Sequence, residues 1–182
     1  MYVSLLRIWK RPLRTLQMPN VVFDNCVLSN FALTEALFIV KRLYAGSAFI
    51  TDFVYAENTR GILRGYQGLS AIREAIKAGW IKELSLESGH ERTLFEMLSV
   101  SLGCGEASSI VIAKERGYVF ACDDRTARRE ASLLGVKLTG TLGILVKSIK
   151  RKIISSPKGD EIMQKMIANG FYSPVKSVKE LL

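Results

Sequence analysis

The sequence predicts a single α/β domain with a central, mainly parallel sheet. Short runs of β-branched and aromatic residues, typical of buried strands, alternate along the chain with longer segments of helical periodicity. Two of the predicted strands lead directly into aspartate residues. Because sites in parallel sheets form beyond the carboxyl ends of the strands, those aspartates are candidate functional residues.

The elements follow one another in a regular order. The segments with a strand or extended pattern are Asn20–Asp24, Ser47–Ile50, Trp80–Leu86, Val119–Cys122 and Val136–Thr139. Helical periodicity covers residues 27–44, 51–60, 70–78, 90–98, 106–116, 124–134, 141–152 and 158–168. Thr51 and Asp52 are candidate N-caps, and glycines close most of the helices.

The chain carries a net charge of +9, concentrated at its two ends. Residues 1–20 hold four basic residues and no acid, and residues 137–182 hold nine basic and three acidic residues. Residues 20–182 are expected to form the domain. Residues 1–19 are either a basic N-terminal arm or a mis-assigned start. In the second case Met18 is the physiological first residue. Excess positive charge favours encounter with polyanions such as nucleic acid.

Cysteine and histidine usage excludes several site classes. The three cysteines form no C-x-x-C motif, so neither a zinc site nor a redox motif is indicated, and a cytoplasmic location is expected. His90 lies in a polar stretch and is expected to be exposed or capping, which argues against Ser-His-Asp and Cys-His hydrolases. No apolar run reaches the roughly 18 residues that a membrane span needs.

Several acids can be explained in two ways, by an ordinary structural role or by membership of a functional site. Asp24 either caps the next helix, a role worth about 1 kcal/mol, or belongs to a site. Glu57 lies four residues after Phe53, so it shares that residue's helical face. Glu106, in a first helical turn, suits the helix dipole by about 0.3–1 kcal/mol.

Asp123 and Asp124 follow a strand and precede a helix. One of them can cap that helix, but adjacent carboxylates repel each other unless a cation neutralises them. Taken together with the other acids, the pair predicts an oxygen-ligand site for Mg²⁺ or Mn²⁺.

Four segments in fixed order carry a resemblance to a known family. They are VVFDNCVLSNFA at 21–32, FITDFVYAEN at 49–58, LGCGEASSIVIAKERG at 102–117 and ACDDRTARREASLLGVKLTGTLGILVKSIKRKII at 121–154. With these segments the chain resembles the PIN domain, particularly a prokaryotic branch of nucleic-acid-binding PIN proteins. The resemblance implies a three-layer α/β/α fold and a ribonuclease site of carboxylates holding one or two Mg²⁺ or Mn²⁺ ions. Many members are toxins of toxin–antitoxin pairs and are usually dimeric, so an antitoxin partner and a homodimer are expected.

The resemblance assigns roles residue by residue. Asp24, Glu57 and Glu106 match the family's first three acids, with glutamate at 106 where many members have aspartate. Asp124 is the preferred match to the last acid, with Asp123 as the alternative. The residues expected to orient Asp24 are Asn25 and Ser29.

Basic residues have to attract an RNA substrate, because the acids repel it. The candidates are Arg125, Arg128, Arg129, Lys147, Lys150 and Arg151, of which the last three equally fit a solvated helix face. Two other functions stay open at this point: a catalytically inactive PIN-fold module that binds nucleic acid, and a haloacid-dehalogenase-type phosphatase. That phosphatase class needs an acid two residues after its nucleophile, where this chain has Cys26.

Overall fold

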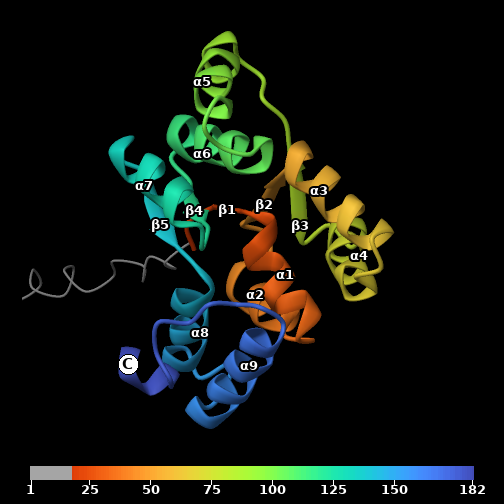
Figure 1. Ribbon diagram of the computed structural model, residues 1–182, viewed down its shortest axis with the longest axis vertical. Helices are drawn as coiled ribbons and strands as arrows, with labels where there is room; N and C mark the ends of the chain where they lie inside the picture. The colour runs from red at the N-terminus through yellow and green to blue at the C-terminus, as the bar shows by residue number, and fades with distance from the viewer. Residues whose placement is uncertain (1–17) are drawn as a thin grey trace, which may run out of the picture.

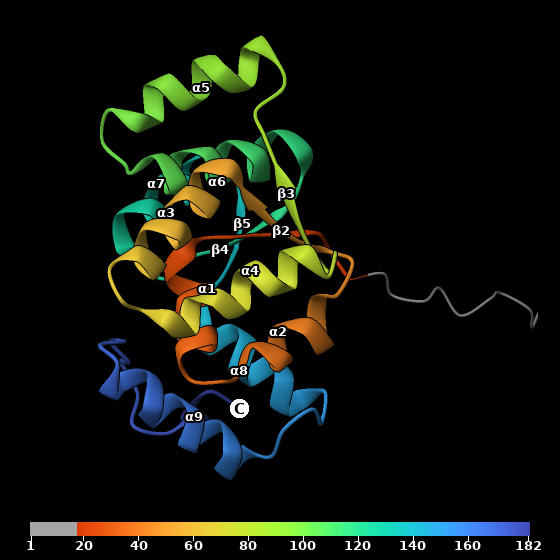
Figure 2. The same ribbon diagram turned by 90° about the vertical axis from the view of Figure 1, so that its right-hand side faces the viewer.

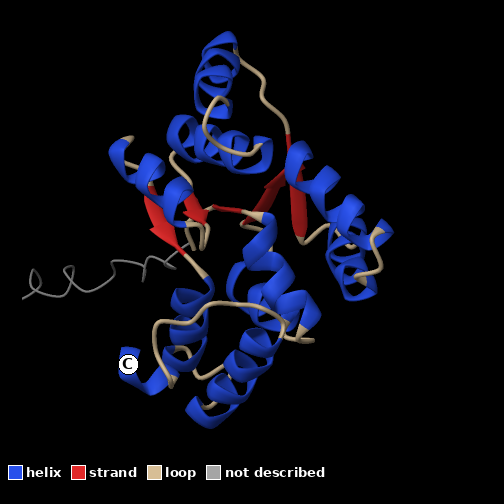
Figure 3. Cartoon of the chain, viewed as in Figure 1, coloured by secondary structure: helices blue, strands red, loops and turns tan. Residues whose placement is uncertain are grey.

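The computed structural model describes residues 18–182, so the expected arm or alternative start within residues 1–19 lies almost entirely outside the described residues. Figures 1 and 3 show a central sheet with helices on both sides. Its strands are β1 (Val21–Phe23), β2 (Ala48–Thr51), β3 (Ile81–Leu84), β4 (Val119–Ala121) and β5 (Lys137–Thr139). They lie in the order β3-β2-β1-β4-β5, and every strand pair is parallel.

Helices cover both faces of the sheet (Figure 2). They are α1 (Asn25–Leu33), α2 (Leu37–Tyr44), α3 (Asp52–Leu63), α4 (Ser70–Lys77), α5 (Gly89–Ser99), α6 (Cys104–Arg116), α7 (Arg125–Leu133), α8 (Thr141–Lys150) and α9 (Ser156–Ala168), with the short 3₁₀ turns η1 (Gln67–Leu69) and η2 (Val178–Leu181). Helix α5 packs against α6 on the side away from the sheet (Figure 2). This arrangement confirms the predicted three-layer α/β/α fold with a parallel central sheet.

Each face of the sheet has its own hydrophobic core, because successive residues of a strand point to opposite faces. Val21 and Phe23 of β1 pack into a core with α1, α2, α8 and α9. Val22, between them, packs into a second core with α6 and α7, which also contains Phe120 of β4. Burial on both faces explains why β1 and β4 are almost continuously apolar.

The predicted helix over residues 27–44 is divided into α1 and α2. Glu35 adopts a left-handed conformation with φ of 58°, and the Thr34 hydroxyl donates to the carbonyl of Asn30 at 2.7 Å. The break redirects the chain, so that α2 packs against α8. Periodicity missed this break because the apolar spacing continues across it.

None of the helices in residues 18–182 has the length and apolar character required to cross a bilayer.

Candidate metal centre

Asp24 lies at the carboxyl end of β1, in the middle of the sheet. Its backbone N–H donates to the carbonyl of Ala121 on β4 at 2.9 Å, which fixes its position between the two strands. The side chain is only 5% exposed and caps α1 by accepting from the backbone N–H of Cys26 at 3.3 Å. Asp24 therefore caps a helix, as one interpretation of the sequence expected, and is buried at a strand end. Its place in a metal site stays a prediction.

Glu57 reaches the same edge of the sheet from α3. Thr51 caps this helix, and its hydroxyl lies 2.8 Å from that of Ser108 on α6, which joins the two helices. The Glu57 carboxylate then accepts from the backbone N–H of Gly105 at 3.3 Å. The amino end of α6 thus supplies both the glycine that holds Glu57 and the neighbouring acid, Glu106.

Gly105 makes room for the Glu57 carboxylate. A Cβ atom at this position would lie 2.7 Å from both of its carboxylate oxygens. We expect Gly105→Ala to push Glu57 aside at little cost in stability, because a glutamate side chain has flexible torsions. Mn²⁺ affinity, measured by calorimetry, should fall by about 10–100-fold.

Gly103→Ala is the matched control, because the one described atom that a Cβ there would meet within 4 Å is Glu106 Oε2, at an ordinary 3.8 Å. Equal Mn²⁺ affinity in the two variants would show that Gly105 does not position Glu57 for metal binding.

Glu106 occupies the third position of α6, where its carboxylate accepts from the backbone N–H of Gly103 at 3.3 Å. This bond satisfies a free donor at the helix start. The side chain is half-buried, so the expected role at the helix dipole coexists with a position inside the acidic cluster.

The acids lie within one another's electrostatic reach. Burial raises the pKa of Asp24 above its ordinary 3.8, and the charge of Asp123 adds to the rise. Burial also raises the pKa of Glu57, with a further contribution from Asp24. The pKa of Glu106 is raised by burial too, and the negative charges that add to it belong to Asp24, Asp124 and Glu57. Acids from distant parts of the chain thus form one cluster, whose ionised form is unfavourable without a cation.

Asp123 and Asp124 have different surroundings. Asp123 Oδ1 accepts from the backbone N–H of Thr141 at 2.9 Å. Its Oδ2 accepts from the Thr141 hydroxyl at 2.6 Å and from Asn30 Nδ2 at 3.2 Å. Asp124 is exposed and caps α7 with one oxygen, which accepts from the Ala127 N–H at 2.9 Å. Asp123 is therefore committed to joining α1, β4 and α8. The second oxygen of Asp124, in contrast, accepts no hydrogen bond from the described residues and can bind a ligand.

This difference predicts different effects for Asp124→Asn and Asp123→Asn. We expect Asp124→Asn to leave thermal stability nearly unchanged, because asparagine caps helices as well as aspartate does. The same change should weaken Mn²⁺ binding. Asp123→Asn should cost about 1–3 kcal/mol of unfolding free energy, because an amide nitrogen would face a hydrogen-bond donor. Thermal unfolding and Mn²⁺ titration of both proteins test this, and the reverse pattern would assign the metal to Asp123.

Two cysteines adjoin Asp24, an arrangement that the sequence did not reveal. One ligand atom from each of Asp24, Cys26 and Cys122 lies within 4.8 Å of the other two. Across residues 18–182, no three of the predicted acids meet that spacing. The hydrogen bond with Cys122, followed by burial, raises the pKa of the Cys26 thiol. A neutral thiol is a poor metal ligand, so the oxygen donors determine which metal the site prefers.

The donor set fits a hard divalent cation. Carboxylate oxygens are the ligands preferred by Mg²⁺ and Mn²⁺, and Mg²⁺ typically uses one or two carboxylates while keeping several waters. The wide spacing of the acids suits such a hydrated ion. Burial and neighbouring negative charges both raise the pKa values of Asp24 and Glu106. A cation bound here would offset the cost of burying these carboxylates and would reduce their mutual repulsion.

The predicted basic residues divide between two places. Arg125 and Arg129 are exposed on α7, immediately after Asp124. Arg128 instead donates through Nη1 to the carbonyls of Cys122 and Thr139, at 2.6 and 2.8 Å, and so joins the ends of β4 and β5.

Lys147, Lys150 and Arg151 lie near the other end of α8 from Asp123. Lys147 Nζ is 3.4 Å from the Tyr44 hydroxyl at the end of α2, and Arg151 Nη2 is 3.7 Å from the sulfur of Met18 before β1. These contacts place the group towards the amino ends of the strands, away from the acidic cluster.

The remaining predicted residues are placed as follows. Within residues 18–182, neither Asn25 nor Ser29 makes a side-chain hydrogen bond to Asp24, and both line a cavity beside Glu57. The His90 side chain is 74% exposed and contacts Glu115 at 3.1 Å, which confirms its expected surface position. Sequence reasoning did not single out Asn30 or Thr141. Both bind Asp123, which lies 93 and 18 residues away from them along the chain.

Comparison with known protein families finds a match over nearly the whole described chain. A family model with the description DUF3368: PIN domain matches residues 20–182. A search among curated proteins finds no match.

Proposed function

Because this chain belongs to the PIN-domain family, whose members are generally nucleases, we propose that it is a divalent-metal-dependent ribonuclease that hydrolyses RNA phosphodiester bonds. The observation that supports this proposal best is the convergence of three acids at the carboxyl edge of the sheet: Asp24 is held between β1 and β4, and Glu57 and Glu106 are both held at the amino end of α6. The charges of Asp24 and Glu57 help to raise the pKa of Glu106, which agrees with this arrangement. These acids would be costly at neutral pH in a protein that did not bind a cation there.

Asp24, Glu57, Glu106 and Asp124 would hold Mg²⁺ or Mn²⁺. When bound, such an ion supplies Lewis acidity towards a phosphoryl oxygen and lowers the pKa of bound water. Asp24 provides a buried, fixed oxygen between β1 and β4. Gly105 holds Glu57, and Asp123 fixes the turn that presents Asp124.

The protein also has to overcome the repulsion between its acids and the substrate. Arg125 and Arg129 follow Asp124 on α7 and are exposed, so they are placed to attract phosphate groups. Arg60 on α3 contributes in the same way, because its charge already acts on the Glu57 carboxylate.

The test is cleavage of single-stranded RNA by the purified full-length chain with Mn²⁺ or Mg²⁺, compared with the same reaction in excess EDTA. We expect cleavage only with the divalent ion. Cleavage that persists in EDTA would contradict the mechanism. RNA binding without cleavage, together with no Mn²⁺ binding in calorimetry, would favour the inactive nucleic-acid-binding module.

Family membership also supports an antitoxin partner, a homodimer and a cytoplasmic setting as parts of the proposal. The structure describes three free cysteines, which agrees with a reducing compartment. A neighbouring small gene for a DNA-binding antitoxin, and copurification of its product with this chain, would test the toxin role.

A further inference from the structure

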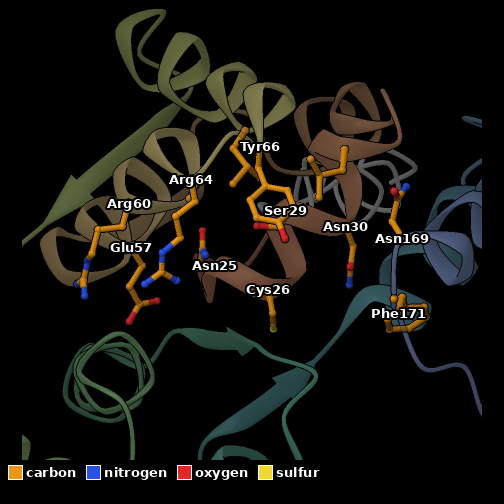
Figure 4. Close-up of a pocket in the computed structure, with 14 residues that line it drawn as sticks. Asn25, Cys26, Ser29, Asn30, Glu57, Arg60, Arg64, Tyr66, Asn169 and Phe171 are labelled. Carbon is orange, nitrogen blue, oxygen red and sulfur yellow. The ribbon is translucent and has the colours of Figure 1, made fainter.

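A cavity of about 490 Å³ opens directly beside the acidic cluster. Its walls come from α1, from α3 and the turn that follows it, and from the segment after α9 (Figure 4). Glu57 belongs both to the cluster and to this wall, and Cys26 lines the cavity two residues after Asp24. The volume lies within the range of about 300–1,000 Å³ that is typical of small-molecule sites.

One side of the cavity carries arginines that the sequence analysis did not single out. Arg60 and Arg64 extend beside Glu57 in Figure 4. Arg60 donates through Nε to the carbonyl of Ala56, which leaves its terminal nitrogens available. Within residues 18–182, neither arginine forms an ion pair with a carboxylate. Guanidinium groups in this state suit a phosphate, which they can bind through two parallel hydrogen bonds.

Two aromatic rings also line the cavity. Tyr66 is 57% exposed although it is a large side chain, and Phe171 lies across the cavity from the arginines (Figure 4). The faces of nucleobases stack on such rings, and stacking tolerates any base because every base has a π-face.

Three amide side chains belong to the lining as well. Asn25 and Asn169 belong to the cavity wall, as does Asn30. Asn25 Oδ1 is buried and has no hydrogen-bond partner in the part of the chain that the structure describes, which is costly for a polar atom. Amides offer both donors and acceptors, and they match the edges of unpaired bases.

We propose that this cavity is a nucleotide subsite, in which Tyr66 and Phe171 receive one unstacked base of single-stranded RNA while Arg60 and Arg64 bind an adjoining phosphate. The inference rests on the proposed ribonuclease function, because it places the strand on the acidic cluster. A base held inside a duplex cannot enter the cavity without unpairing, so the subsite selects single-stranded RNA.

Binding tests the subsite separately from catalysis. In the full-length Asp24→Asn protein, in which we expect RNA cleavage to be at least about 100-fold slower, fluorescence anisotropy measures the Kd for a labelled single strand of about ten nucleotides and for a hairpin duplex. We expect Tyr66→Ala to weaken single-strand binding about tenfold and to change duplex binding less than twofold. Tyr66→Phe keeps the ring and should bind like the parent.

Arg64→Ala should weaken single-strand binding and reduce its salt dependence by about one phosphate contact. Tyr172→Ala, a ring that is 84% exposed and outside the cavity lining, is the matched aromatic control, and Arg92→Ala on α5 is the charge control. Both controls should bind like the parent.

The outcomes separate the subsite from the ribonuclease. Single-strand binding within twofold of the parent for Tyr66→Ala, or an equal loss for the duplex, overturns the subsite even if the wild-type chain cleaves RNA. Selective loss of single-strand binding supports the subsite even if the wild-type chain has no nuclease activity.

Discussion

Asp24→Asn is expected to reduce divalent-dependent RNA cleavage by at least about 100-fold while raising the stability of the metal-free protein at neutral pH. Asparagine keeps the shape of the side chain, and its oxygen can still accept from the Cys26 N–H, so α1 remains capped. The change removes only the buried negative charge of Asp24, which we propose binds the cation. Loss of activity and gain of stability together distinguish a functional carboxylate from a structural one.

The direction of the stability change follows from the pKa. Burial raises the pKa of folded Asp24 above the ordinary 3.8 that applies to the unfolded chain. Between these two values the folded state binds more protons than the unfolded state, so stability falls as pH rises through that window. Above both values the full cost of the charge persists, and Asp24→Asn removes it.

Thermal unfolding in EDTA at several pH values, repeated with excess Mn²⁺, measures these effects. The wild-type Tm should decline as pH rises above about 4, and the decline should be smaller in Asp24→Asn. Mn²⁺ at about 100 times its Kd should stabilise the wild-type chain by about 2.7 kcal/mol and the variant much less.

Glu96→Gln, at an exposed acid on α5, is the matched control and should behave like the wild-type chain. A lower Tm for Asp24→Asn in EDTA at neutral pH, or equal Mn²⁺ stabilisation of both proteins, would show that Asp24 has a structural role instead.

Gly140→Ala is expected to cause the largest loss of stability among single methyl additions near the site. A Cβ atom at Gly140 would lie 2.5 Å from Asp123 Oδ1 and 3.0 Å from the backbone oxygen of Cys122. The carboxylate cannot move away freely, because Thr141 and Asn30 hold it.

The alanine therefore has to break these bonds or displace the strand end. Either response costs about 2–4 kcal/mol of unfolding free energy, which corresponds to roughly 5–15 °C in Tm for a chain of this size. Gly140 has an extended backbone with φ of −167°, so the cost comes from contacts and not from its conformation.

Thermal unfolding of Gly140→Ala alongside Gly89→Ala tests this expectation. A Cβ at Gly89, the first residue of α5, would meet nothing within 4 Å in the described residues, so that variant should keep its Tm. A Tm for Gly140→Ala within about 2 °C of the wild-type value would mean that the Asp123 network tolerates displacement.

The strand and helix pattern was predictable because it depends on local spacing. The run from Val21 to Phe23 is apolar at every position, as a strand buried on both faces must be, and β1 forms there. Thr51 was predicted as an N-cap and caps α3. The division of residues 27–44 was not predictable from periodicity, because a left-handed residue such as Glu35 changes the chain direction without changing the apolar spacing.

The acidic residues were identifiable one by one, but their separate environments were not. Asp123 and Asp124 are identical in type and adjacent in sequence, yet only Asp123 is enclosed by Thr141 and Asn30. Arg128 and Arg129 likewise read as equivalent basic residues, although Arg128 joins two strand ends. Nothing local marks these differences, because each partner lies on another element.

The sequence by itself determined the α/β class, the order of the elements, the family and the acids that are candidates for a metal. Only the tertiary structure decided which oxygen of the aspartate pair is free, that Gly105 and Gly140 shape the carboxylate positions, and that a cavity with arginine and aromatic walls adjoins Glu57. The physical reason is range: strand and helix periodicities act over a few residues. Packing of α1, α3, α6 and α8 around one sheet edge, in contrast, joins groups up to 111 residues apart.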